Sequence, residues 1–194
     1  LAFALAWVVV VFVLIAFAVS LLRQFISSPE QPLTSPVPVQ EPSEPEQREV
    51  TLFFADAEAS SLLAEKRIIQ LGTGIQADAA VIVAELIHGP QLERLNPTIP
   101  PDTRLLNVFY LDNVLVLNFS QELQANHSGG SAGELATVYS IVNTMSENLR
   151  GVKKVQILLE NAEIETLTGH LDLTRPIPPD TKWMKTLPRK GITS

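Results

Sequence analysis

Cysteine is absent from the 194 residues of the sequence. Its absence excludes, within these residues, a disulfide framework, a thiol nucleophile, a zinc site built on thiolates and a lipidated cysteine of the lipoprotein type. The sequence also holds only three histidines, and each stands in a different segment: His88, His127 and His170. Neither a His-x-x-x-His pair nor an aspartate-rich calcium loop is present. We therefore expect no metal site and no cofactor.

The serines also lack the context of a catalytic nucleophile. Ser120 and Ser131 are the two candidates, and neither lies in the Gly-x-Ser-x-Gly turn that exposes the serine of many hydrolases. We therefore predict no catalytic residues and expect that the chain is not an enzyme.

Acidic residues outnumber basic residues, and the formal net charge is −7. Residues 175–194 are instead net basic, because they contain five Lys or Arg and the single acid Asp180. The part that precedes them is therefore more acidic than the total suggests. An acidic chain repels phosphates, so nucleic acid is not an expected partner.

The first 22 residues contain no charge, and Ser20 is their one conventionally polar residue. At about 1.5 Å per residue such a helix would measure roughly 33 Å, enough to cross the hydrocarbon core of a bilayer. We interpret residues 1–23 as one transmembrane helix. A cleaved signal peptide is the alternative, because Ala16-Phe17-Ala18 resembles a cleavage site. The hydrophobic core of a signal peptide is usually shorter, roughly 7 to 15 residues.

Residues 24–49 are rich in Pro, Glu and Ser and contain little that could form a core. We expect an extended linker of about 3.1 Å per residue. Its charged residues are mainly acidic, unlike the basic flanks typical of the cytoplasmic side of a membrane. We therefore predict a single-pass membrane protein whose C-terminal domain lies outside the cytoplasm, in the periplasm or at the cell surface.

The hydrophobic pattern after the linker alternates between strand and helix periods. Strands are predicted over 50–55 and 63–71, and a helix is predicted over 75–88. The helix has an apolar stripe and ends at Gly89-Pro90, which favours a positive φ and then prevents continuation. Two further apolar runs flank Asp112-Asn113 and predict a hairpin of 105–111 with 114–119. Because its second arm is apolar on both faces, we expect this strand to be central, and either covered on each side or open to a partner.

A second amphipathic helix is predicted over 131–149, where Ser131 and Glu134 have the spacing of a capping box. A strand over 155–159 follows. Together these elements predict an α+β fold, with one layered mixed or antiparallel sheet of about five strands and two amphipathic helices, preceded by the transmembrane helix. The domain is expected at 50–178 and a basic, flexible tail at 179–194.

Several short segments of this domain resemble the GerMN domain of bacterial sporulation and germination proteins. They are Leu86-Ile87-His88-Gly89-Pro90, Ile99-Pro100-Pro101-Asp102-Thr103, Leu117-Asn118-Phe119-Ser120, Gly130-Ser131 with Glu134, Val155-Gln156-Ile157-Leu158, and Gly169-His170. Asn161 departs from the pattern, because glycine is expected after the late strand; asparagine tolerates the left-handed conformation that such a turn needs. The resemblance implies an extracytoplasmic module of envelope and spore assemblies, without catalytic residues.

Two functional hypotheses follow. In the first, the domain is a scaffold that docks with itself or with other envelope proteins through a sheet edge or an apolar face. In the second, it binds or hydrolyses cell-wall peptidoglycan, with polar loop residues as its site. The candidate interaction or ligand residues are His170, Asp172, Ser131 and Glu134.

Overall fold

The computed structural model describes residues 47–185. The predicted transmembrane helix (1–23), nearly all of the predicted linker and the last nine residues lie outside this range. Among the described residues, no helix is both long and apolar enough to cross a membrane. The expected anchor therefore stays a prediction.

The described residues form two sheets and two main helices. The first sheet contains β1 (Gln47–Ala55), β2 (Leu62–Gln70) and β7 (Met184–Lys185), in the order β1-β2-β7. The second contains β3 (Leu105–Leu111), β4 (Val114–Phe119), β5 (Lys154–Leu159) and β6 (Ala162–Glu163), in the order β3-β4-β5-β6. The main helices are α2 (Ile75–His88) and α4 (Ser131–Asn148), with a short α3 (Glu122–Ala125) between β4 and α4.

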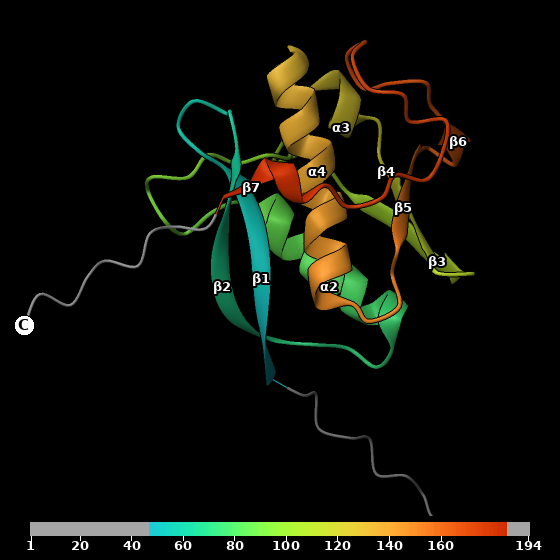
Figure 1. The fold of residues 1–194 in the computed structure, drawn as a ribbon. Helices are drawn as coiled ribbons and strands as arrows, with labels where there is room; N and C mark the ends of the chain where they lie inside the picture. Colours follow the sequence, from blue (N-terminus) through green and yellow to red (C-terminus); the bar gives the residue numbers. More distant parts are fainter. Residues whose placement is uncertain (1–46, 186–194) are drawn as a thin grey trace, which may run out of the picture. The chain divides into compact units, whose positions relative to one another are not determined.

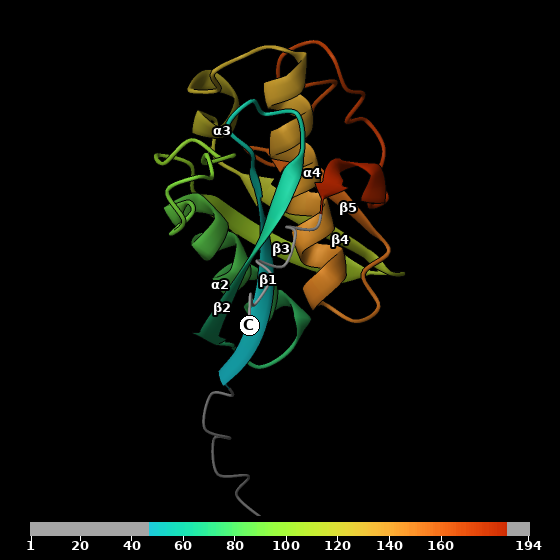
Figure 2. The same cartoon turned by 60° about the vertical axis from the view of Figure 1, so that its left-hand side comes forward.

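The α+β class and the two helices are confirmed, but the prediction of one sheet was wrong. Figure 1 shows the helices between the two sheets, and α2 and α4 each contact β1 on one side and the second sheet on the other. Figure 2 turns the hairpin of β1 and β2 toward the viewer, with the helices behind it. A single core fills the space between the layers, since side chains of β1, β4, β5 and both helices belong to one buried cluster.

The local predictions for the helix and the hairpin hold. Helix α2 has the predicted limits, and Gly89 after it has a φ of 85°. The turn Asp112-Asn113 has φ values of 49° and 66°, which matches the right-handed twist of a two-residue hairpin. Strand β4 is central, as predicted, because it pairs antiparallel with β3 and parallel with β5.

Part of the predicted tail is structured. Residues Thr181–Trp183 form a 3₁₀ turn, and Met184–Lys185 pair in parallel with β2 as β7. The Trp183 ring stacks on Tyr139 of α4 at a centroid distance of 6.0 Å. This contact explains why the chain continues in a defined course beyond residue 178.

The outer edge of β1 is bonded to side chains of α4 rather than to another strand. Thr144 Oγ1 accepts from the Phe53 N–H at 3.1 Å, and Ser140 Oγ donates to the Phe53 carbonyl at 2.6 Å. Asn148 accepts from the Thr51 N–H at 2.9 Å and donates to the Thr51 carbonyl at 2.7 Å. The three α4 residues are four positions apart, so they lie on one face of the helix. This polar stripe therefore satisfies backbone groups on the edge of β1 that no described strand pairs with.

Replacing Thr144 by valine should destabilise the fold, because it leaves the buried Phe53 N–H without its acceptor while keeping the side-chain shape. The expected loss is about 1–3 kcal/mol in the free energy of unfolding, measured by urea denaturation. Ser146→Ala is the matched control on the same helix, because the Ser146 hydroxyl has no hydrogen-bond partner in the described structure. Equal stability of T144V and S146A would contradict this role of the stripe.

Candidate functional site

Glu134, in the first turn of α4, is fully buried and holds the loop of residues 166–170. Its carboxylate accepts hydrogen bonds from the Leu167 and His170 N–H groups, both at 2.8 Å, and from Thr168 Oγ1 at 2.9 Å. The Thr166 hydroxyl donates to the same carboxylate. Four donors from one loop therefore converge on one side chain, and they tie the segment after β6 to the start of α4.

The same donors determine the charge state of Glu134. Burial raises the pKa of the carboxyl, but the hydrogen bonds from Thr166, Thr168 and His170 stabilise its charged form more strongly. The result is a pKa lowered from 4.5 to about 2. The Glu134 carboxylate is therefore ionised at neutral pH, and its hydrogen bonds are made to groups of the same chain.

Ser131 does not form the capping box predicted with Glu134. The N-cap of α4 is Gly130, with a φ of 79°, and no side chain caps the helix. Ser131 is exposed, and Glu134 bonds to the distant loop instead of to the helix start. The prediction failed because a tertiary set of four donors competes with one local backbone amide.

His170 is the last of Glu134's hydrogen-bond donors in the chain and Asp172 follows it, and both line one open surface hollow together with Thr166 and Thr174. His170 contributes its main-chain N–H and has an exposed ring. Asp172 accepts from the Thr174 N–H at 2.9 Å and the Thr174 hydroxyl at 2.6 Å, and these bonds lower its pKa. Among residues 47–185, no group of His, Asp and Glu could hold a metal ion. The peptidoglycan hypothesis for these residues stays a prediction.

A buried charge cluster on β2 was missed by sequence reasoning. The side chains of Glu65 and Arg67 are each 4% exposed and form an ion pair at 2.5 Å. Arg67 also pairs with Glu85 of α2 at 2.7 Å and donates to the Gly89 carbonyl at 2.6 Å. Glu65 accepts from the N–H groups of Gln91 and Leu92. The sequence pattern that could have indicated this cluster is a pair of opposite charges two residues apart, which places both side chains on one face of a strand.

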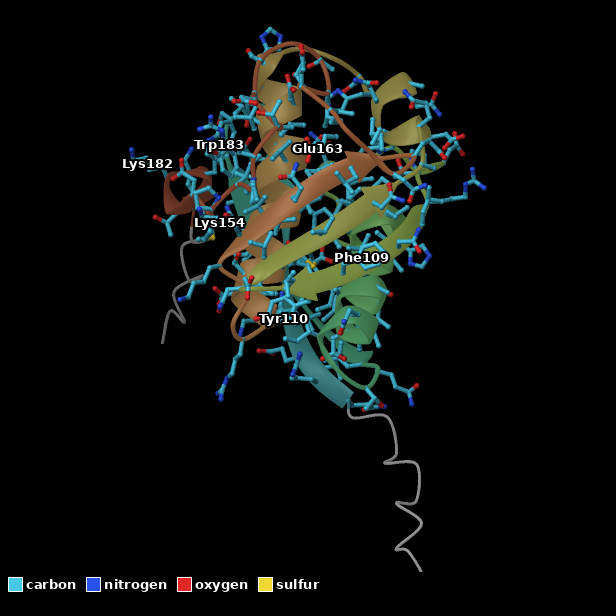
Figure 3. All side chains as sticks on the ribbon, turned by 90° about the vertical axis from the view of Figure 1, so that its right-hand side faces the viewer. Phe109, Tyr110, Lys154, Glu163, Lys182 and Trp183 are labelled. Atoms are coloured by element: carbon cyan, nitrogen blue, oxygen red, sulfur yellow. The ribbon has the colours of Figure 1, made fainter. Side chains whose placement is uncertain are left out.

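The outer face of the second sheet was anticipated as a surface that could await a partner. Five apolar side chains lie on it: Phe109 and Leu111 of β3 are 56% and 72% exposed, and Val114, Val116 and Leu158 of β4 and β5 are half-buried. The polar side chains of Asn118 and Gln156 on the same face are buried, and Gln156 donates to the Leu173 carbonyl. Figure 3 shows the strands in front, with both helices behind them. We call the five apolar residues the open face. Lys154 and Glu163 lie near its margin.

Asn118 fixes the turn beside the open face. Its side chain donates to Asn161 Oδ1 at 2.8 Å and accepts from the Asn161 N–H at 2.8 Å. Asn161 has a φ of 67°, so the expectation that asparagine replaces glycine in this turn is confirmed. The buried amide of Asn118 thereby joins β4 to the turn between β5 and β6.

The stability of the domain should depend on pH through Glu134. Because its pKa is lowered in the folded state from 4.5 to about 2, its contribution is present above about pH 4.5 and is lost as the pH falls toward 2. The difference corresponds to roughly 3 kcal/mol. Glu134→Gln should therefore lower the free energy of unfolding at pH 7 by up to roughly 3 kcal/mol and by little at pH 2.

The exposed Glu165 on the same loop provides the matched control, Glu165→Gln. Urea denaturation from pH 2 to pH 7 compares the two variants with the parent chain. An E134Q variant that keeps the parent pH dependence would show that Glu134 is not the responsible group.

Comparison with known proteins identifies the family of this domain. The family model described as "Germane: Sporulation and spore germination" matches residues 51–165, more than half of the chain. A comparison with curated proteins finds no match.

Two solved bacterial structures share the fold. One is a protein from Clostridium perfringens described as a "Putative Lipoprotein", with 24% identity and a TM-score of 0.50, over 68% of this chain and 87% of the other. The second contains the tandem GerMN domains of the sporulation protein GerM from Bacillus subtilis, with 19% identity and a TM-score of 0.54. That match covers 70% of this chain and 45% of the tandem structure. By its family match, and in agreement with the resemblance seen in its sequence, the chain belongs to the Germane family of GerMN domains.

Proposed function

We propose that the chain is a non-enzymatic interaction module of the bacterial cell envelope, which docks other envelope proteins or further copies of itself on the open face of its second sheet. The observation that carries this proposal is the exposure of two large apolar side chains, Phe109 and Leu111, on the edge strand of a sheet face that no described helix covers.

The open face has the composition of a binding surface. Burying a phenylalanine or leucine side chain contributes roughly 1.5–3 kcal/mol, so a partner that covers Phe109 and Leu111 would gain this free energy on binding. Val114, Val116 and Leu158 extend the apolar area, while Lys154 and Glu163 supply charges near its margin. An apolar centre with a polar rim is typical of protein–protein interfaces.

The open face is also held rigidly, which favours binding. The strands of the face are held from behind by the shared core, and Asn118 fixes the adjacent turn. A rigid face loses little conformational entropy on binding, which favours affinity.

One prediction and one likeness in fold support the extracytoplasmic location of the proposed function. The prediction is the anchor and linker at residues 1–49, which would hold the domain away from a membrane. The likeness in fold is to a protein described as a lipoprotein and to a sporulation protein. We place the domain in the periplasm or at the cell surface on this basis.

Photo-crosslinking in cells tests this function. A benzoyl-phenylalanine residue at Asn107, which is exposed beside Phe109 on the same face, should form adducts of defined mass with an envelope protein or with the chain itself. The double variant Phe109→Ser, Leu111→Ser should remove these adducts, because the two most exposed apolar side chains of the open face are lost. A crosslinker at Ile68, which is 73% exposed on the first sheet, is the control and should form none of them.

Two outcomes would count against the proposal. One is the absence of adducts at Asn107 in cells that contain the folded chain. The other is a set of adducts that is the same for Asn107 and Ile68, which would indicate chance collisions rather than a specific surface.

A further inference from the structure

His127 uses both nitrogens of its ring in hydrogen bonds. It stands in the loop of residues 126–130, which joins α3 to α4. Its Nδ1 accepts from the Gly129 N–H at 3.0 Å, and its Nε2 lies 2.9 Å from Thr137 Oγ1 on α4. The ring also packs on Gly133, where an added Cβ would lie 3.5 Å from its Cε1 atom. One side chain therefore ties the loop to the helix that follows it.

The hydrogen on the neutral His127 ring has one possible position in this network. The Thr137 hydroxyl donates its single hydrogen to the Thr98 carbonyl at 2.5 Å, so its oxygen can only accept from His127. On the other side of the ring, the Gly129 N–H can only donate. The neutral ring therefore carries its hydrogen on Nε2 and uses the lone pair of Nδ1 to hold Gly129.

The neighbouring hydroxyls prevent a rearrangement of these bonds. Ser140 donates to the Phe53 carbonyl at 2.6 Å, so the Thr98 hydroxyl must donate to Ser140 Oγ, 2.7 Å away. Thr98, Thr137 and Ser140 are each 7% exposed or less. Turning the Thr137 or the Ser140 hydroxyl would remove the donor from a buried carbonyl, which is costly. A second proton on the ring can therefore bind only at Nδ1.

Protonation of Nδ1 is incompatible with the bonded loop. It would place a new N–H against the Gly129 N–H, with two donor nitrogens 3.0 Å apart. Burial also disfavours the charged ring and lowers the pKa of His127 from 6.5. Attraction to Glu134 and a hydrogen bond with the Gly133 backbone raise this pKa, but the net shift is downward. Acid therefore breaks the bond between the ring and Gly129.

We propose that His127 is an acid-sensitive latch, which holds residues 126–130 on α4 while its ring is neutral and releases them when the ring gains a proton. This role does not depend on the open face or on a partner there. Helix α4 has no side-chain cap, and the two glycines before it, Gly129 and Gly130, have φ values of 82° and 79°. Because glycine restricts the backbone so little, the position of this loop depends on the latch.

The latched loop forms one wall of a surface hollow. The connection of residues 96–101 lines the same hollow, together with Ala136 and Thr137 of α4. The loop also leads directly into the first turn of α4, where Glu134 binds the loop of residues 166–170. Release of the latch would therefore widen the hollow and loosen the start of α4.

The charged groups around the ring leave His127 as the group that responds near neutral pH. Glu134 of α4 attracts the proton of the ring. Asp102 accepts a hydrogen bond from the adjacent Asn126 at 3.4 Å, and Glu122 lies on α3. These three groups are carboxylates, which titrate well below the range of histidine. Among the described residues that line the hollow, none besides His127 has a titratable side chain.

Nitrogen NMR of the full chain, labelled with nitrogen-15 histidine in mild detergent, tests the latch directly. Variants that replace one histidine at a time assign the signals of His88, His127 and His170. The neutral His127 ring should show its hydrogen on Nε2, and it should titrate at lower pH than in a short peptide of residues 124–130. Glu134→Gln should lower that pH further, because its attraction for the proton is lost. A hydrogen on Nδ1, or titration at the pH of the peptide, would overturn the proposal.

Unfolding in urea supplies a second measurement. His127→Gln keeps a donor for Thr137 but cannot gain a proton. Because the pKa of His127 is lowered in the folded state, its stabilising effect is complete above about pH 6.5 and is lost as the pH falls. From about pH 7.5 to about pH 5, the unfolding constant of the parent chain should rise at least about three-fold more than that of H127Q.

The exposed Ser128 beside the latch provides the matched control, Ser128→Ala, which should keep the pH dependence of the parent chain. The same pH dependence in the parent chain and in H127Q would reject the latch. So would a loss of the pH dependence in S128A as large as that in H127Q, because any change in the loop would then have the same effect.

Discussion

The side-chain hydrogen bonds from α4 to the edge of β1 organise this domain. A strand edge inside a protein must satisfy its N–H and C=O groups, and the usual partner is another strand. Here Ser140, Thr144 and Asn148 take that place. These hydrogen bonds hold α4 against β1 in one rotation about its axis. Its apolar side chains Val138, Ile141 and Met145 therefore point into the shared core. This contact fixes how α4 packs against the β1–β2 hairpin in the three-layer arrangement.

The fixed rotation of α4 also determines which segments contact its first turn and its middle. At the N-terminus it places Glu134 under the loop of residues 166–170, and that carboxylate binds four donors. In the middle it presents Tyr139 to Trp183, which positions the chain for its parallel pairing with β2. The second sheet receives both helices on its inner face, and Phe109 and Leu111 on its outer face are left to solvent or to a partner.

The elements that were predicted correctly are those fixed by local periodicity and turn chemistry. Helix α2 has the predicted ends because Gly89 stops it, and the β3–β4 hairpin follows from Asp112-Asn113. The second sheet was missed because Ser140, Thr144 and Asn148 resemble the solvent-facing side of an amphipathic helix. Their acceptors and donors lie about 90 residues earlier in the chain, at Thr51 and Phe53, and no local pattern records that distance. Glu134 was placed in a candidate site, but its local role as a cap gave way to a tertiary one.

The placement of β3 depends on polar contacts that no hydrophobic pattern could supply. The connection from α2 to β3 is bonded to Glu65 and Arg67 at its start and to the Ala55 carbonyl at Asn96. It is bonded again where Thr98 meets Ser140 of α4 at 2.7 Å. A buried ion pair such as Glu65–Arg67 adds little net stability, because desolvation offsets the attraction, but removing one partner is costly. Its main effect here is therefore to fix the path of the connection between α2 and β3. That path places β3 at the edge of its sheet, where its outer backbone groups pair with no described strand.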